Sequence, residues 1–94
     1  MAYVRGDLEA VEAKSLDELY SAAVKAVEEL ELALISKNKD ALSAEIIARD
    51  AEDKKIRIKL SSAAEGTTKV TIRVGTFGSQ IKSRTIYEKI KENL

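Results

Sequence analysis

Three segments between Asp40 and Thr76 alternate apolar and polar residues with a strict period of two. The aliphatic positions of these segments are Leu42, Ala44, Ile46 and Ala48, then Ile56, Ile58 and Leu60, and then Val70, Ile72 and Val74. The side chains that point the other way include Glu45, Arg49, Lys55, Arg57, Lys59, Lys69, Thr71 and Arg73, most of which are basic. This pattern predicts a half-buried antiparallel sheet with one face on the core and the other in solvent.

A strand and a helix are predicted before the alternating segments. The strand runs from Tyr3 to Lys14, with Gly6 as a bulge or a close-packing point and with Val4, Leu8 and Ala10 on its apolar face. A capping box at residues 15–18, in which the Ser15 hydroxyl accepts from the Glu18 amide, indicates where the helix begins. We place the helix end near Glu31. Its apolar stripe comprises Leu16, Leu19, Tyr20, Ala23, Val27, Leu30 and Leu34.

The rest of the chain predicts a four-stranded meander and a second helix. The strand from Leu32 to Lys37 precedes the three alternating segments, and polar connections at residues 38–40, 50–54 and 65–66 separate the strands. We expect Ser79 to cap the second helix and Phe77 to turn inward at the end of the core. The apolar side of that helix comprises Ile81, Ile86, Tyr87, Ile90 and Leu94.

These elements predict a single α+β domain over residues 1–94, in the order β-α-β-β-β-β-α. Both helices must cover the apolar face of the sheet, because a two-layer sandwich is the smallest arrangement that buries every stripe. We therefore expect a mainly antiparallel five-stranded sheet. The first strand is placed antiparallel beside the fifth, which gives the order 2-3-4-5-1 and resembles a small helix-grip sheet.

The composition limits the classes of function that this chain can have. The 94 residues suffice for one core, and the 16 basic and 16 acidic residues cancel, which removes the general argument for a nucleic-acid partner. The chain has no His and no Cys, and no Ser lies in a G-x-S-x-G motif. We therefore expect no enzyme, no cofactor and no metal. No apolar run approaches the roughly 20 residues of a membrane span.

A basic face is the first candidate site. Five cations share one face of adjacent strands and are suited to phosphates or to an anionic membrane surface: Lys55, Arg57, Lys59, Lys69 and Arg73. No aromatic residue accompanies them, which disfavours nucleic-acid binding through stacked bases. Neutralisation by cross-strand acids is the favoured interpretation, with Glu9, Glu12, Glu45, Glu52 and Glu65 as the candidates.

Two loops offer further candidates. A glycine-bearing loop at the start of the second helix could hold an anion on its backbone amides, helped by Lys82 and Arg84, and its candidate residues are Gly75, Thr76, Gly78 and Ser79. It lacks a Gly-Lys-Ser/Thr sequence, and simple turn geometry is favoured. The carboxylates of residues 50–53 are the kind of ligand that calcium takes, but acids in a turn more often cap the backbone.

Two stretches carry a resemblance to a known family. They are Tyr3-Val4-Arg5-Gly6-Asp7-Leu8-Glu9-Ala10 and Ile72-Arg73-Val74-Gly75-Thr76-Phe77-Gly78, the latter running into Ser83-Arg84. They resemble the ends of a family of small bacterial lipoproteins of unknown function, and the resemblance spans nearly the whole chain. In that family a signal peptide and a lipidated cysteine precede the folded part. The resemblance implies a periplasm-facing envelope domain without its anchor, with Met1 standing where the anchor would be, and it assigns no catalytic or binding residue.

Three functions remain as expectations. The first is a non-enzymatic envelope domain that contacts an unknown protein partner through its sheet face or the loop from Gly75 to Ser79. The second is a carrier of a small ligand between the sheet and the helices. The third is anion or nucleic-acid binding by the basic face, for which a cytoplasmic location is the alternative. We expect a monomer or a weak homo-oligomer formed through the open edge of the second strand.

Overall fold

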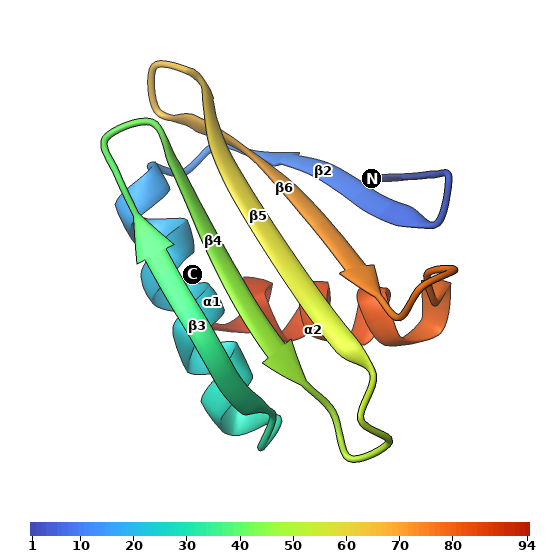
Figure 1. Cartoon of the computed structure of the whole chain (residues 1–94). Helices are drawn as coiled ribbons and strands as arrows, with labels where there is room; N and C mark the ends of the chain where they lie inside the picture. Colours follow the sequence, from blue (N-terminus) through green and yellow to red (C-terminus); the bar gives the residue numbers. More distant parts are fainter.

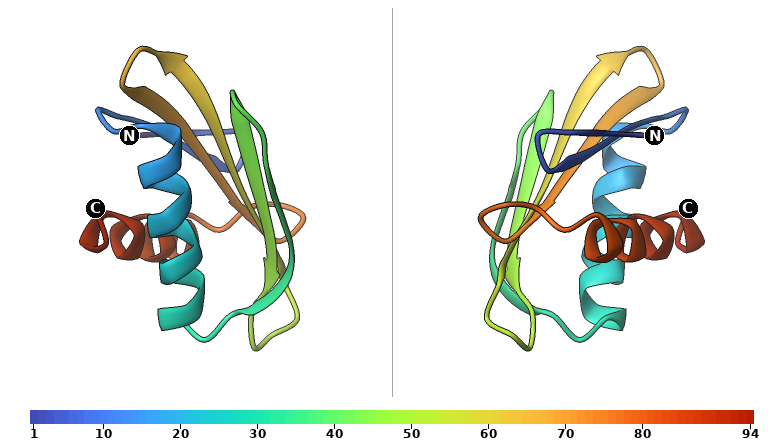
Figure 2. Two further views of the ribbon diagram at one scale, coloured as in Figure 1. Left: turned by 90° about the vertical axis from the view of Figure 1, so that its left-hand side faces the viewer. Right: turned by 90° about the vertical axis from the view of Figure 1, so that its right-hand side faces the viewer.

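Two helices cover one face of an antiparallel sheet (Figure 1). The computed structural model describes residues 1–94, and the predicted α+β two-layer architecture is confirmed. The strands are β1 (Ala2–Val4), β2 (Asp7–Glu12), β3 (Ala33–Lys39), β4 (Ser43–Arg49), β5 (Lys55–Ala64) and β6 (Thr67–Val74). The helices are α1 (Leu16–Glu29) and α2 (Gln80–Glu92). They cross each other at a steep angle on the concave side of the sheet (Figure 2).

The sheet has the order β1-β2-β6-β5-β4-β3, which confirms the predicted arrangement and adds a sixth strand. The added strand arises because the first segment does not continue through Gly6 as a bulged strand. Arg5 and Gly6 both have positive φ angles, of 52° and 87°, and form a tight turn between β1 and β2. The turn pairs Val4 with Asp7 on the solvent face, so Val4 is 44% exposed and the prediction that it is buried was wrong.

As predicted from the period of two, the apolar residues of the alternating segments form the inner face of the sheet. The alternating aliphatic residues of β4, β5 and β6 are almost fully buried, and they pack with Leu8, Ala10 and both helices in one cluster of 20 residues. Leu42 is the exception and is 70% exposed. It lies in the turn before β4, where Asp40 Oδ1 accepts hydrogen bonds of 2.9 Å from the amides of Leu42 and Ser43.

Helix α1 begins as predicted, since the Ser15 hydroxyl accepts from the Glu18 amide. Its end needs no glycine. Glu31 adopts a left-handed φ of 56°, and the amides of Glu31 and Leu32 donate back to the carbonyls of Glu28 and Val27, each at 3.0 Å. These two bonds form a Schellman cap, which satisfies the last carbonyls of the helix. Leu34 does not extend the helix stripe, because it lies in β3.

Helix α2 is capped by Ser79, whose hydroxyl accepts from the Lys82 amide, as predicted. Its buried stripe consists of Ser83, Ile86, Tyr87 and Ile90. The prediction for Ile81 was wrong, because this side chain lies off the stripe and is 82% exposed. The stripe includes a polar group instead: the Ser83 hydroxyl is fully buried and has no hydrogen-bond partner.

Ser83→Ala is expected to raise the free energy of unfolding by about 1 kcal/mol, because it removes a desolvated hydroxyl and installs a better helix former. Urea denaturation measures the change. Ser21→Ala is the matched control, since Ser21 is exposed within α1, and it should gain only about 0.5 kcal/mol from helix propensity. Equal gains in the two variants would show that burial of the Ser83 hydroxyl has no cost.

Candidate functional site

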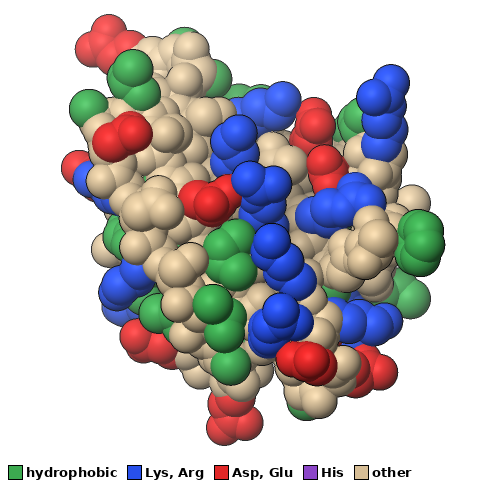
Figure 3. All heavy atoms as spheres, viewed as in Figure 1, with side chains coloured by type: hydrophobic (Ala, Val, Ile, Leu, Met, Phe, Trp, Pro, Cys, Tyr) green, Lys and Arg blue, Asp and Glu red, His purple; other side chains and the backbone are tan.

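The outer face of the sheet brings the five predicted basic residues together. Arg57 is the direct cross-strand partner of Arg73, and Ser61 is that of Lys69. In the view of Figure 3 the Lys and Arg side chains form a band along β5 and β6. The pairing of β5 with β6 therefore joins the predicted basic residues in one continuous surface.

Acidic neighbours neutralise part of this surface. Arg57 pairs with Glu45 at 2.6 Å, and Lys69 pairs with Glu9 at 3.4 Å, which confirms two of the expected cross-strand partners. Two other expected partners are engaged elsewhere, because Glu12 accepts from the Tyr87 hydroxyl and Glu52 from Lys82. Burial of the Tyr87 ring and its bond to Glu12 raise the pKa of this phenol. Lys55 and Lys59 take part in none of the ion pairs.

Arg73 differs from the other basic residues because its guanidinium joins three segments. Nη1 donates to the Arg5 carbonyl at 2.7 Å and to Asp7 Oδ1 at 2.9 Å, while Nη2 donates to the Thr76 carbonyl. The side chain thus ties the β1–β2 turn to the segment that follows β6. Arg73 contributes charge to the basic face, but its donors are committed to the fold.

The loop of Gly75–Ser79 packs closely against the β1–β2 turn. A Cβ added to Gly78 would lie 2.1 Å from the Gly6 carbonyl oxygen, and a Cβ added to Gly6 would lie 2.5 Å from the Phe77 carbonyl oxygen. The two backbones are therefore in contact with no room for a side chain. The Gly75 amide donates to the Lys55 carbonyl at 2.8 Å, so it is not free for an anion. Turn geometry and close packing account for these glycines.

Phe77 contradicts the prediction that it closes the core. The backbone of this loop lies against the β1–β2 turn, but the phenyl ring projects outward with 90% of its surface exposed. A hollow of about 530 Å³ lies beside it, lined also by Lys54, Lys55 and Arg49. The loop thus presents an aromatic side chain next to basic ones. Sequence patterning missed this because an isolated Phe beside a strand normally enters the core.

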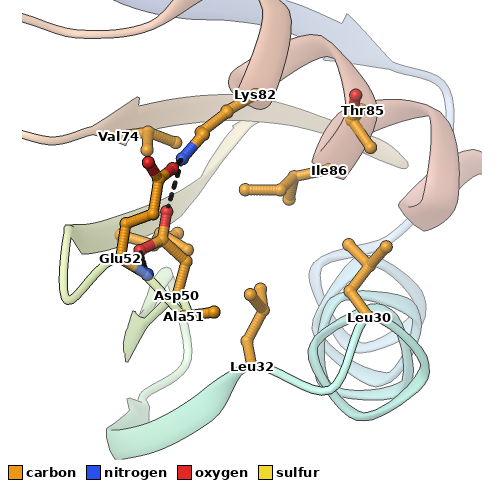
Figure 4. Close-up of a pocket in the computed structure, with 10 residues that line it drawn as sticks. Leu30, Leu32, Asp50, Ala51, Glu52, Val74, Lys82, Thr85 and Ile86 are labelled. Carbon is orange, nitrogen blue, oxygen red and sulfur yellow. Dashed lines mark hydrogen bonds and ion pairs between the residues drawn. The ribbon is translucent and has the colours of Figure 1, made fainter.

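A second hollow lies between the ends of the two layers (Figure 4). It encloses about 300 Å³. Its apolar wall comes from the end of α1, the start of β3, the neighbouring strands and α2, and comprises Leu30, Leu32, Ala51, Ile56, Val74 and Ile86. Figure 4 shows Leu30, Leu32 and Ile86 pointing into the space, opposite a charged rim of Asp50, Glu52 and Lys82.

The charged rim is internally satisfied. Lys82 Nζ lies 3.0 Å from Asp50 Oδ2 and also contacts Glu52. Asp50 Oδ1 accepts from the amides of Glu52 and Lys54, each at 2.9 Å, so it caps the β4–β5 turn as the favoured interpretation predicted. The Lys54 amide, followed by Lys82, lowers the pKa of Asp50, and the hydrogen bond to Glu52 is the first cause of the raised pKa of Lys82. These carboxylates stabilise the hairpin and dock α2 on it.

Asp50→Asn is expected to destabilise the protein at neutral pH and to have little effect in strong acid. Because the folded state lowers the pKa of Asp50 from its ordinary value of 3.8, the stabilisation is present above that value and is lost as the pH falls through the lower folded pKa. Urea denaturation from pH 7 to about pH 2 is expected to show that the free energies of unfolding of the wild type and of Asp50→Asn converge as the pH falls. Lys82→Gln should keep most of the acid sensitivity, since the Lys54 amide is the larger cause. If the difference in free energy of unfolding between the wild type and Asp50→Asn stayed constant with pH, the stabilising role of the ionised Asp50 would be contradicted.

No helix of the structure combines the length and the apolar character needed to cross a bilayer. The chain matches no curated protein. Residues 1–93 match a family described as a protein of unknown function, DUF3568, and the chain therefore belongs to this family.

Proposed function

We propose that this domain is a non-enzymatic recognition module of the bacterial cell envelope, and that it binds another protein through the loop of Gly75–Ser79. The observation that carries the proposal is the exposure of Phe77 on a loop that is itself fixed. Aromatic side chains are enriched in the buried centres of protein interfaces, where they act as anchors. A fixed loop loses little conformational entropy when a partner binds it.

The surroundings of Phe77 define the chemistry of the partner. Ile81, four residues further along the chain, adds a second exposed apolar side chain at the first turn of α2. Lys54 and Lys55 line the hollow next to the ring and take part in no ion pair. A partner with an apolar pocket and an acidic rim complements this arrangement, because the pocket would take the ring and the acids would meet the lysines.

A non-enzymatic role accords with the distribution of reactive groups. The sequence contains neither His nor Cys, and the carboxylates at the hollow of Figure 4 are engaged by Lys82 and by backbone amides. A general base must be free to take a proton from a substrate. Asp50 instead accepts hydrogen bonds from the backbone amides of the β4–β5 turn.

Site-specific photo-cross-linking tests the protein contact. A benzophenone amino acid at position 77 is expected to give one discrete cross-linked species when the protein is expressed in the cells that encode it. Position 42 is the matched control, because Leu42 is also an exposed apolar residue in a turn, on the opposite edge of the sheet. Cross-linking at position 77 that does not exceed that at position 42 would refute the proposal.

The envelope location rests on the resemblance to small bacterial lipoproteins. Its test is the intact mass and membrane partition of the protein produced from its own gene in its own cells. A lipidated N-terminus in the membrane fraction supports the location. A soluble and unmodified protein in the cytoplasm would refute it.

Binding of a small ligand is the second candidate function, and the hollow of about 300 Å³ favours it. Its apolar wall and charged rim suit a small amphipathic molecule. A thermal-shift screen with such molecules is expected to find stabilising ligands. Ala51→Trp should abolish their effect, because Ala51 is an exposed residue of the apolar wall and an indole there would fill part of the hollow. Stabilisation that survives Ala51→Trp would place the ligand elsewhere.

A further inference from the structure

The outer face of β5 carries a row of cations that the proposed protein contact does not use in full. Lys55, Arg57 and Lys59 alternate with buried residues along the strand and share its solvent side. Alternate side chains of an extended strand are separated by about 6.6 Å. The row is therefore regularly spaced, and its outer two members have no acidic partner.

The neighbouring strand places another cation directly opposite this row. Arg57 and Arg73 are cross-strand partners, and like charges in that position repel each other. They line two adjoining hollows, one of about 200 Å³ with Lys55 and the other of about 260 Å³ with Lys59. An anion seated in the first hollow would lie among three cations and relieve their repulsion, whereas the second hollow is also lined by the carboxylate of Asp7, which is paired with Arg73.

Arg57 also retains free donors. Its one side-chain hydrogen bond runs from Nε to Glu45, so its two terminal amino groups bond to no protein acceptor. Paired guanidinium N–H groups match the geometry of phosphate oxygens. Arg57 is therefore the residue of this surface best suited to bind phosphate directly.

The charge balance of the face favours an anionic ligand. Five basic side chains stand there, and three acids pair with them: Glu45, Glu9 and Asp7. The difference of five and three leaves two positive charges, which reside on Lys55 and Lys59. The chain as a whole has a formal net charge of zero, so this excess is local to the sheet face.

We propose that this face binds a linear phosphate polymer, with phosphate groups seated against Lys55, Arg57 and Lys59 along β5. Phosphate polymers carry charge more densely than the row does, since one strand of duplex DNA has a phosphate per about 3.4 Å of axis. One chain can thus place an oxyanion at each cation. The four aromatic residues of the sequence are Tyr3, Tyr20, Phe77 and Tyr87, and none lies on β5 or β6, so the row itself carries no platform on which bases could stack.

Titration with long-chain inorganic polyphosphate by calorimetry tests the proposal. Binding is expected at about 50 mM salt and should weaken roughly tenfold or more by about 200 mM, because several counterions are released. The double variant Lys55→Glu/Lys59→Glu is expected to weaken binding by at least about tenfold. Lys55→Gln/Lys59→Gln should give a smaller loss in the same direction, and it serves as the second variant if the first does not fold.

Lys25→Glu/Lys37→Glu is the matched control, since it makes the same change in net charge away from this face. Lys25 is exposed on α1, and Lys37 is registered with the core-facing Ile46. This control variant is expected to weaken polyphosphate binding by less than about threefold, because it acts only through long-range electrostatic repulsion. Phe77→Ser should leave polyphosphate binding unchanged, which separates this inference from the proposed protein contact.

Three outcomes would overturn the inference. They are no binding at low salt, equal losses in the two charge-reversal variants, and a poly-dT oligonucleotide that binds more tightly than polyphosphate of equal charge. The last result would mean that bases, and not only phosphates, are recognised. Binding by polyphosphate but not by orthophosphate at the same total phosphate concentration supports a polymer lying along the whole row.

Discussion

Gly78→Ala is expected to lower the free energy of unfolding by roughly 3–5 kcal/mol, enough to leave much of the protein unfolded. The new Cβ would lie 2.1 Å from the Gly6 carbonyl oxygen, and backbone on both sides cannot yield as a flexible side chain would. The φ of 81° at Gly78 adds a penalty for any L residue with a side chain. Urea or thermal unfolding measures the loss.

Gly66→Ala is the matched control for this variant. Gly66 has a similar φ of 71°, but a Cβ there meets nothing within 4 Å. Its substitution is expected to cost only about 1 kcal/mol, the cost of the left-handed conformation. Similar losses in the two variants would show that the contact between Gly78 and Gly6 contributes nothing beyond backbone strain.

Arg73→Met is expected to lower the free energy of unfolding by about 2–3 kcal/mol, since it removes hydrogen bonds to two backbone carbonyls and the pairing with Asp7. The loop of Gly75–Ser79 should also become mobile, because the guanidinium is what ties Thr76 to the β1–β2 turn. Hydrogen exchange of amides 75–79 is the direct measurement, with faster exchange expected there than in the rest of the sheet.

Arg57→Met serves as the control for Arg73→Met. Arg57 occupies the opposite position on β5 and forms a single side-chain hydrogen bond, from its exposed guanidinium to Glu45. Its loss is expected to change stability by less than about 1 kcal/mol, as for other surface ion pairs. Unchanged exchange of the 75–79 amides in Arg73→Met would contradict the structural role of this side chain.

The rigidity of the loop determines how Phe77 acts. If Arg73, Gly6 and Gly78 fix the loop, the ring is presented in one position before any partner arrives, and the entropy cost of binding is small. Phe77→Ser should then leave stability almost unchanged while weakening the binding of the partner. Arg73→Met should weaken the same contact indirectly, through mobility of the loop.

The hydrophobic pattern by itself determined the main architecture. Buried strands with a solvent face require alternation, and Ile56, Ile58 and Leu60 supply it without ambiguity. Ser15 and Ser79 determined the two helix starts, because a capping hydroxyl acts on amides only three residues away. Interactions of this kind are local, so the sequence alone suffices to predict them.

Other features depend on contacts between segments far apart in the sequence, and only the tertiary structure decided them. The turn at Arg5 and Gly6 forms where the backbone of Gly78 packs against it, about seventy residues later. That contact also directs Phe77 outward, which no local pattern indicates. Arg73 was one of five equivalent cations in the sequence, and its separate role appeared only once the carbonyls of Arg5 and Thr76 lay beside it.

The candidate sites divide in the same way. Alternation along β5 and β6 was enough to predict a shared basic face, because strand period fixes which side chains point together. The excess charge at Lys55 and Lys59 depended on which acids the sheet register brought near, and Glu12 and Glu52 were drawn away by α2. The sequence thus determined where the charges lie along each strand, whereas packing of α2 and the β1–β2 turn decided which of them remain free to bind.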